Sequence, residues 1–469
     1  MGLATMGWRV RNILIIILIL SALLRLHGIT NPYLDDQGWR QGDTASMAYN
    51  MLEQLDEYPE VFFPKLNYDG SGPQKVELEF PFLPYLLAWT WTIFGWGDFW
   101  GRLWAVIFSL LTILGVYKFS SAAFSPRVGL WAGIIYGLTP ITIYYGRVVM
   151  PEPIAQAFSI WALVAILNWR KKSTWGRLLI SSLFMAGAIL GKLPQLMLFP
   201  VALLIGFFPF RRNIKFLLFY CFFALLGPML YYTWVHFGAG TESQFVSGIL
   251  SYQVAEGSTL YLKNLLENFQ KGLSYPLLLI AILGLIIIIK DKKIHMNISY
   301  ALGLWFLITF TYLVIICLKI PLDYYLVPMA LPLALGAGYF LAYWQGKVGH
   351  GKRALLGGAL VLGILSFQHL YYYQVKYQWN EEILGQALWI QENTEPNSVL
   401  LLSDSPPMTL YYAQRYGYRL TNPDEEQAFG DIRNYPSNYL VILPGSRSEE
   451  FRQKVKEFYR EVGPDVYKL

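Results

Sequence analysis

Three aspartates, Asp35, Asp36 and Asp43, stand in a polar cluster near the start of the chain, residues 34–44 with the sequence LDDQGWRQGDT. An apolar pattern of helical spacing follows from Ala45 onward. A carboxylate held near the start of a helix can take a proton from a hydroxyl group, which is the task of a general base. Asp43 and Asp36 are therefore candidate catalytic residues.

A second polar cluster, residues 146–153 (GRVVMPEP), interrupts long apolar sequence. Two prolines flank Glu152, so we expect one helix to end and another to begin there. Ionisable groups at membrane depth are costly and tend to be functional. Glu152 is a second candidate acid, and Arg147 a candidate cation.

Two isolated lysines also lie between apolar segments, each beside a proline. Lys192 stands in GKLP (191–194), and Lys319 stands in LKIPLDYY (318–325). Cations can stabilise the charge that develops on a phosphate leaving group. Together with Tyr324 and Tyr325, these lysines suggest transfer from a lipid phosphate to a hydroxyl group.

The composition is that of a membrane protein. Of the 469 residues, 55% are hydrophobic and 14% are charged, and soluble proteins average about 25% charged residues. Disorder and a purely soluble fold are excluded. The two cysteines, Cys221 and Cys317, lie in apolar runs, which argues against a disulfide framework and against Cys-based metal sites. Nothing indicates nucleic-acid binding.

About eleven transmembrane helices are predicted, on the basis that a span needs about 20 apolar residues. They lie near 13–24, 103–121, 128–146, 154–169, 178–191, 195–209, 216–236, 274–289, 297–318, 323–343 and 354–372. The apolar segment 82–95 is too short to span and is rich in Trp and Tyr, so we expect it to lie flat at the outer surface.

Charge sets the expected orientation. If 82–95 does not span, the loops 118–127, 170–177, 210–215, 290–295 and 344–353 fall on one side, and they hold many Lys and Arg but only one acid, Asp291. The positive-inside rule makes that side cytoplasmic, together with the N-terminus. The expected domains are a transmembrane part, 1–372, whose first loop, 31–101, is extracytoplasmic, and an extracytoplasmic tail, 373–469.

The tail differs in composition from the rest. It carries 14 acids against 10 Lys and Arg, whereas residues 1–372 carry 17 against 27. Helix-like and strand-like stretches alternate in it, including 381–392, 398–402, 439–443 and 449–461. The fold class is therefore an all-α polytopic membrane bundle with a small soluble α/β domain at the C-terminus.

These motifs, in this order, resemble the GT-C superfamily of integral-membrane glycosyltransferases, in the branch of the protein O-mannosyltransferases and lipid A aminoarabinose transferases (family 39-like). The resemblance covers roughly residues 1–345. It rests on 39–52 (WRQGDTASMAYNML), 77–85 (ELEFPFLPY), the pair Arg147 and Glu152, and the two lysine motifs. Where familiar members have an Asp-Glu pair, this chain has Arg40-Gln41.

The resemblance implies a polyprenyl-phosphate sugar donor and an inverting transfer at the outer face of a bacterial or archaeal plasma membrane. Asp43 or Asp36 would be the base, and Glu152 a second acid. The donor phosphate would be bound by Arg147, Lys192, Lys319 and Arg40. Glu79, Tyr324 and Tyr325 would contact substrate.

The acceptor could be a glycan, a lipid or a protein, and Asp43 and Glu152 are the candidate ligands if a divalent cation such as Mg²⁺ or Mn²⁺ takes part. The alternative function is a non-enzymatic translocase of lipid-linked glycans or a polymer export component. A translocase needs charged groups through the bilayer centre. The predicted spans are nearly free of them, which favours the transferase.

Overall fold

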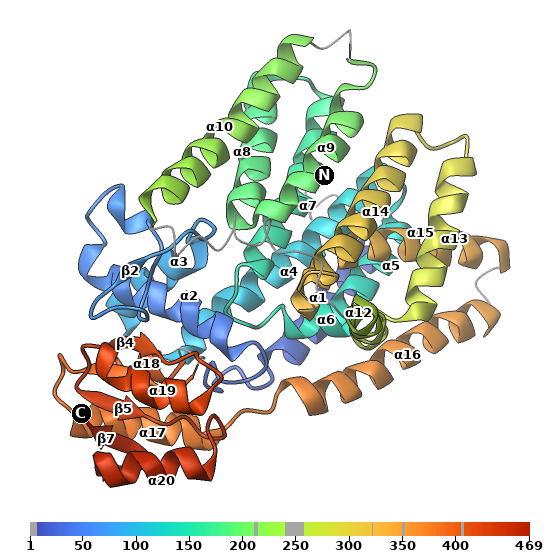
Figure 1. The fold of residues 1–469 in the computed structure, drawn as a ribbon. Helices are drawn as coiled ribbons and strands as arrows, with labels where there is room; N and C mark the ends of the chain where they lie inside the picture. Colours follow the sequence, from blue (N-terminus) through green and yellow to red (C-terminus); the bar gives the residue numbers. More distant parts are fainter. Residues whose placement is uncertain (1–6, 211–213, 240–257, 321, 349–351, 405–407) are drawn as a thin grey trace. The chain divides into compact units, whose positions relative to one another are not determined.

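The structure is a computed structural model that describes residues 7–210, 214–239, 258–320, 322–348, 352–404 and 408–469 (Figure 1). Parts of two expected cytoplasmic loops, 211–213 and 349–351, lie outside the described residues, as does Pro321 of the second lysine motif. The chain divides into two compact units.

Unit 1 comprises the described residues of Met1–Ile29, Arg102–Trp234 and Val246–Lys376 and consists of helices. Their bounds are α1 Trp8–Leu26, α4 Asp98–Ala123, α5 Pro126–Leu138, α6 Pro140–Tyr144, α7 Glu152–Lys171, α8 Trp175–Gly191, α9 Leu198–Phe207, α10 Ile214–Gly238, α12 Ser258–Gly272, α13 Tyr275–Lys290, α14 Met296–Cys317, α15 Ala330–Val348 and α16 Lys352–Lys376. The first turn of α4 and the last turn of α10 are grouped with unit 2.

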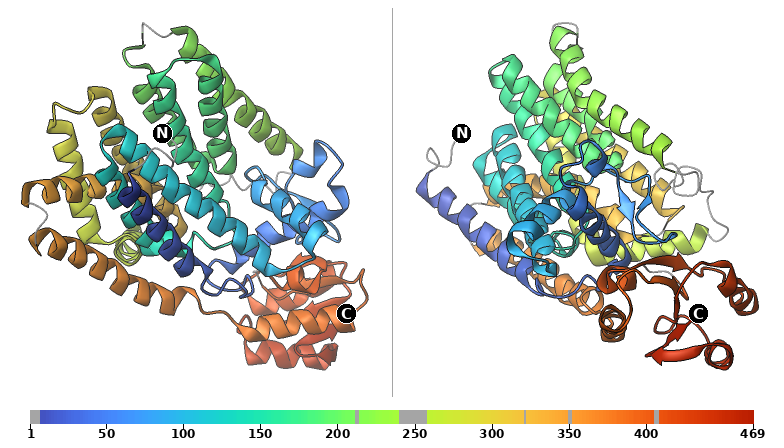
Figure 2. Two further views of the ribbon diagram at one scale, coloured as in Figure 1. Left: turned by 180° about the vertical axis from the view of Figure 1, so that it is seen from behind. Right: turned by 90° about the vertical axis from the view of Figure 1, so that its left-hand side faces the viewer.

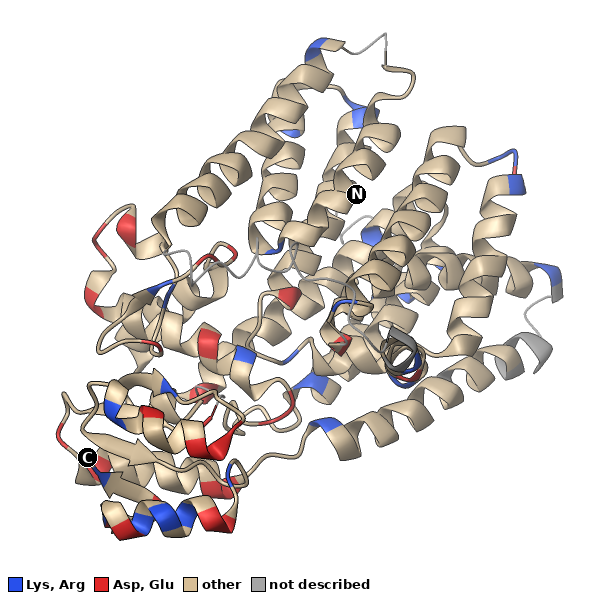
Figure 3. Ribbon diagram, in the orientation of Figure 1, with Lys and Arg blue, Asp and Glu red and all other residues tan. Residues whose placement is uncertain are grey.

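The helices of unit 1 are apolar along their length. Figure 3 shows few charged residues in their middle parts, with Lys and Arg mostly near helix ends. The helices α7, α8 and α9 run side by side (teal to green in Figure 2). Gly284 and Gly336 let α13 and α15 approach closely, because a Cβ on Gly284 would overlap the carbonyl oxygen of Gly336.

Within the described residues, four helices are long and apolar enough to cross a membrane: Asp98–Ala123, Ile214–Gly238, Met296–Cys317 and Asp323–Lys347. A fifth span results if the bent pair Tyr261–Gly272 and Tyr275–Lys290 is counted as one. Some predicted spans are broken: α5 ends at Leu138 because Thr139, which precedes Pro140, takes an extended conformation. The number eleven stays a prediction.

Unit 2 combines the first loop with the C-terminal tail, in the described residues of Thr30–Gly101, Val235–Phe245 and Tyr377–Leu469. The first loop forms α2 Gly38–Met51, a two-stranded sheet of β1 Lys65–Leu66 and β2 Gln74–Lys75, and α3 Phe82–Phe94. At 13 residues, α3 is short for a span, which is consistent with the prediction for this segment.

The tail folds as helices around a mixed five-stranded sheet of order β4-β3-β5-β7-β6 (Figure 1). Its elements are α17 Glu381–Asn393, β3 Val399–Leu402, α18 Met408–Ala413, β4 Tyr416–Arg419, α19 Glu425–Asp431, β5 Tyr439–Val441, α20 Glu449–Phe458, β6 Arg460–Gly463 and β7 Val466–Lys468. Strands β4, β3 and β5 are parallel, and β7 runs antiparallel to β5 and β6. Side chains such as Leu401 and Leu440 form the core.

The first loop and the tail are joined inside unit 2 by specific polar contacts. The Asp98 carboxylate accepts hydrogen bonds from the hydroxyls of Tyr412, at 2.8 Å, and Tyr411, at 3.3 Å. The Tyr416 hydroxyl donates to Asn50 on α2, at 2.9 Å. Met408 packs on α2 at Gly42, where a Cβ would lie 3.3 Å from its Cγ. The tail therefore positions α2 and its acid.

Candidate active site

Asp43 lies in the first part of α2 and is 3% exposed. Arg40, one turn earlier on the same helix, places Nη1 3.7 Å from Oδ2 of Asp43 and also forms an ion pair with Glu79. The structure thus brings three predicted site residues together. The other carboxylate oxygen of Asp43, Oδ1, is buried and has no hydrogen-bond partner among the described residues.

Burial dominates the electrostatics of this carboxyl group. It raises the pKa of Asp43 to about 7, although Arg40, Arg419 and a hydrogen bond from Tyr68 each act to lower it. Desolvation disfavours the charged form, and two guanidinium groups offset that effect only in part. A carboxyl group with this pKa is poised to exchange a proton near neutral pH.

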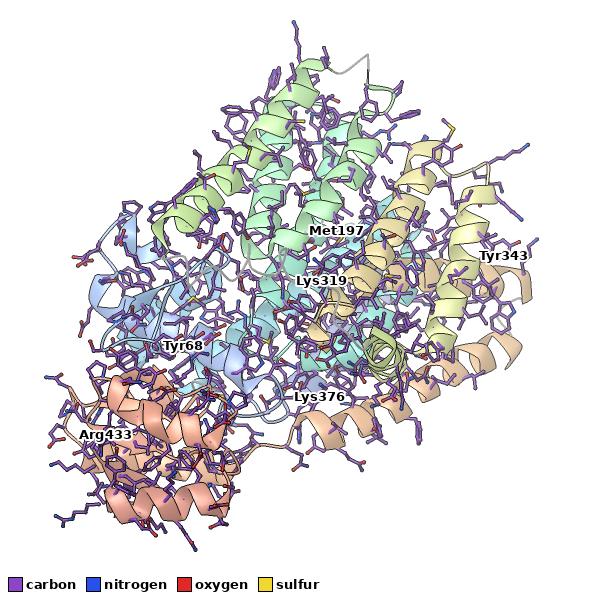
Figure 4. The ribbon with its side chains drawn as sticks, viewed as in Figure 1. Tyr68, Met197, Lys319, Tyr343, Lys376 and Arg433 are labelled. Atoms are coloured by element: carbon purple, nitrogen blue, oxygen red, sulfur yellow. The ribbon has the colours of Figure 1, made fainter. Side chains whose placement is uncertain are left out.

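Two residues beside Asp43 were missed by sequence reasoning. The guanidinium of Arg419 lies 4.0 Å from the centre of the Tyr68 ring and pairs with Asp69, with Nη2 2.5 Å from Oδ2. Figure 4 labels Tyr68 in the first loop. Arg419 lies at the end of β4 in the tail, so no local pattern could have linked it to Asp43.

The remaining polar residues of the first loop are arranged differently. Asp36 precedes α2 and is half-buried, and its backbone oxygen accepts from Gln41 Nε2, at 3.3 Å. The same amide donates to Asp35, at 2.6 Å. Glu77 of the second motif is buried and lies 2.8 Å from Nδ1 of His236. Of the two candidate bases, Asp43 is the more deeply buried.

In unit 1, Glu152 begins α7, is 2% exposed, and pairs with Lys192, which follows the C-terminus of α8. The Lys192 ammonium group lies 4.5 Å from the centre of the Tyr324 ring and 5.8 Å from that of Tyr325. Four predicted site residues therefore form one cluster. Glu152 Oε2 has no hydrogen-bond partner among the described residues.

Asp323, which directly precedes the two tyrosines, fixes their segment. Its Oδ1 accepts from the Tyr145 hydroxyl at 2.6 Å, and its Oδ2 accepts from the Tyr372 hydroxyl at 2.9 Å and Lys376 Nζ at 2.8 Å. Lys376, labelled in Figure 4, ends α16. Asp323 belongs to the motif LKIPLDYY (318–325), but the sequence did not indicate that it contacts residues so distant along the chain.

The other two predicted phosphate ligands have separate settings. Arg147 is fully buried, donates from Nη2 to the backbone oxygen of Gly28 at 2.9 Å, and lies over the Tyr144 ring. Lys319 follows the C-terminus of α14 and is partly buried (Figure 4). Arg147 is thus held in place by contacts within the helical unit.

The described residues contain no group of three or more His, Cys, Asp or Glu side chains placed to hold a metal ion. Within unit 2, the neighbours of Asp43 include Arg40 and Arg419, which favour an anion over a divalent cation. A metal at Asp43 or Glu152 stays a prediction.

Comparisons with known proteins agree with this fold. Residues 78–235 match the family model described as dolichyl-phosphate-mannose-protein mannosyltransferase. No curated protein sequence matches the chain at a significant level.

Solved structures resemble the chain over nearly its whole length. The archaeal oligosaccharyltransferase AglB from Archaeoglobus fulgidus, in complex with an inhibitory peptide and a dolichol-phosphate, superposes with a TM-score of 0.65 at 14% identity, covering 93% of this chain and 70% of that one. ArnT from Cupriavidus metallidurans, in its apo state, gives 0.65 at 14% identity, covering 97% of both chains. Its complex with undecaprenyl phosphate gives 0.66 at the same identity and coverage.

The resemblance found in the sequence is therefore confirmed at the level of the fold and of one segment: the chain has the fold of AglB and ArnT, and residues 78–235 are similar to the dolichyl-phosphate-mannose-protein mannosyltransferases.

Proposed function

We propose that this protein is a glycosyltransferase that moves a sugar from a polyprenyl-phosphate donor to a hydroxyl acceptor, with inversion at the anomeric carbon and Asp43 as the general base. The observation that carries the proposal is the buried carboxyl group of Asp43, with a pKa of about 7 and an unpartnered Oδ1. The GT-C fold supports it, because solved proteins of this fold were captured with dolichol-phosphate and undecaprenyl phosphate.

In the proposed reaction, Oδ1 of Asp43 takes the proton of the acceptor hydroxyl. The acceptor oxygen then bonds to the anomeric carbon from the face opposite the phosphate. The bond between that carbon and the phosphate oxygen breaks, and polyprenyl phosphate leaves with the electron pair. A single displacement of this kind inverts the configuration. Arg40 stabilises the ionised form of Asp43, because it lies 3.7 Å from the carboxylate.

We assign the donor phosphate to the cations of the predicted set, with Lys192 first. Its ammonium group is held by Glu152 and by the faces of Tyr324 and Tyr325, so it is oriented before substrate arrives. Preorganised charge stabilises a leaving phosphate without reorganisation during the reaction. Arg147, Lys319 and Arg40 are proposed as further phosphate ligands, Glu152 as a second acid, and Glu79, Tyr324 and Tyr325 as substrate contacts.

The proposed setting is the plasma membrane, crossed several times by the chain, with a cytoplasmic N-terminus and an extracytoplasmic first loop and tail. The long apolar helices support a multi-pass membrane protein, and the distribution of Lys and Arg supports this orientation. The acceptor is proposed to be a glycan, a lipid or a protein with a free hydroxyl group.

The proposal is tested with membranes that contain the protein and a panel of radiolabelled polyprenyl-phosphate sugars, with native extract as the acceptor source. Consumption of one donor by the wild type, and its loss in Asp43→Asn but not in Asp36→Asn, supports the proposal. If expression is matched and no donor is consumed, the translocase alternative is favoured. If only Asp36→Asn is inactive, the base has been assigned wrongly.

A further inference from the structure

A cleft of about 630 Å³ lies in unit 1, and none of the residues proposed for catalysis lines it. It is bounded by α1 through Val10 and Ile13, by the start of α5, and by Gln345 of α15. The walls are predominantly apolar, from side chains such as Leu130 and Ile134. A cleft of this kind in a membrane helix bundle has the dimensions and chemistry to hold a hydrocarbon chain.

The polar end of the cleft is positively charged. Arg127 lines it, and Arg9 and Arg11 flank Val10 on α1. All three arginines are exposed, and α1, α5 and α15 contain no acidic residue. Lys347 stands two positions after Gln345, with its ammonium group 5.7 Å from the centre of the Tyr343 ring, which Figure 4 labels. The helix ends around this cleft therefore favour an anionic head group.

Aromatic and amide side chains lie between the apolar part of the cleft and its positively charged end. Trp131 donates from its indole N–H to the Gln345 side-chain oxygen, at 3.2 Å, which ties α5 to α15 across the cleft. Trp8, at the start of α1, is 65% exposed. Tryptophan prefers the level of the lipid head groups. The apolar part of the cleft thus lies toward the hydrocarbon core and the arginines toward the head groups.

We propose that this cleft binds one anionic phospholipid, with an acyl chain along Ile13, Leu130 and Ile134 and the phosphate at Arg127. On the orientation proposed above, this lipid comes from the cytoplasmic leaflet. Charge complementarity selects an anionic phospholipid over a zwitterionic one, because a net negative head group gains more from Arg9, Arg11 and Arg127. The inference does not depend on the proposed activity.

The test is native mass spectrometry of the purified full-length protein in detergent, titrated with phosphatidylglycerol, phosphatidylethanolamine or undecaprenyl phosphate. The variants are Arg127→Gln, which removes the charge, and Ile13→Trp, which fills the cleft at a side chain that is 43% exposed. Lys290→Gln is the matched control, because Lys290 is an exposed cation at the end of α13, away from the cleft.

We expect one phosphatidylglycerol to bind in preference to phosphatidylethanolamine, with its occupancy several-fold lower in both cleft variants and unchanged in Lys290→Gln. Equal binding of the two phospholipids, or equal occupancy in the wild type and both cleft variants, would overturn the proposal. If undecaprenyl phosphate displaces phosphatidylglycerol in the wild type at equal concentration and not in Arg127→Gln, the occupant is a polyprenyl lipid and the proposal is wrong about its identity.

Discussion

Asp43 lies 3.7 Å from the guanidinium group of Arg40, and yet its pKa is raised to about 7. A neighbouring cation normally lowers the pKa of an aspartate. Here the burial of Asp43 outweighs both Arg40 and Arg419, so the protonated and ionised forms have similar populations at neutral pH. This balance is the physical basis of the base role proposed for Asp43.

The pH dependence of activity follows from this pKa. Because the base must be ionised to accept a proton, kcat/KM is expected to fall about tenfold per pH unit below pH 7. The measurement is the initial rate of donor consumption between pH 5 and 9 at low donor concentration. The residual activity of Asp43→Asn should lack this acidic limb. If the limb persists in that variant, another group titrates.

Stability should respond to pH in the opposite direction. The pKa of Asp43 is about 7 in the folded protein and about 3.9 in an unfolded chain, so the folded state binds more protons between these values. The contribution of Asp43 to stability therefore falls as pH rises from about 4 to 7. Asp43→Asn is free of this effect, so its Tm relative to wild type should rise by a few degrees between pH 4.5 and 8. A constant difference would argue against the raised pKa.

The pair of Glu152 and Lys192 gives a double-mutant prediction. Lys192→Met leaves the buried Glu152 carboxylate without its partner, and breaking a buried pair costs about 3–5 kcal/mol. The double variant Glu152→Gln/Lys192→Met removes both charges and should regain most of that stability. Thermal unfolding in detergent measures both. Equal losses of stability in Lys192→Met and in the double variant would show that Glu152 and Lys192 do not stabilise each other in the folded protein.

The hydroxyl of Tyr412 should matter for holding the tail to the first loop. It donates to Asp98 at 2.8 Å and lies 2.5 Å from the Tyr33 backbone nitrogen, which donates to it. Tyr412→Phe removes both of these hydrogen bonds, one of which is to a charged carboxylate, at a cost of about 1–3 kcal/mol. Hydrogen exchange of residues 408–419 should become faster. Tyr435→Phe, the same change elsewhere in the tail, is the control, and equal exchange in both variants would contradict the prediction.

Local patterns predicted much of the fold, because they depend on neighbouring residues. The apolar spacing from Ala45 predicted a helix that the structure extends back to Gly38, and the tail helix expected at 381–392 is α17. The number of spans was harder, because Pro140 breaks an apolar run that hydropathy alone reads as continuous.

The candidate site was predicted in its residue types more than in its geometry. Side chains from the first loop and the tail meet around Asp43, so the roles of Tyr68 and Arg419 depend on tertiary packing alone. Lys192 and Glu152 were both expected between apolar segments, a pattern that does not specify that the two side chains pair. The structural role of Asp323 depends on three partners that are distant in the sequence, Tyr145, Tyr372 and Lys376.

The most direct test of Asp43 as the general base is the rate of sugar release from a polyprenyl-phosphate sugar by the purified protein, with native extract as the acceptor source. Wild type, Asp43→Asn and Asp56→Asn are compared, because Asp56 is an exposed acid of the same loop. We expect Asp43→Asn to be slower by about 10²–10⁴-fold and Asp56→Asn to match the wild type. A wild-type rate in Asp43→Asn, with the same donor and folded protein, would contradict it.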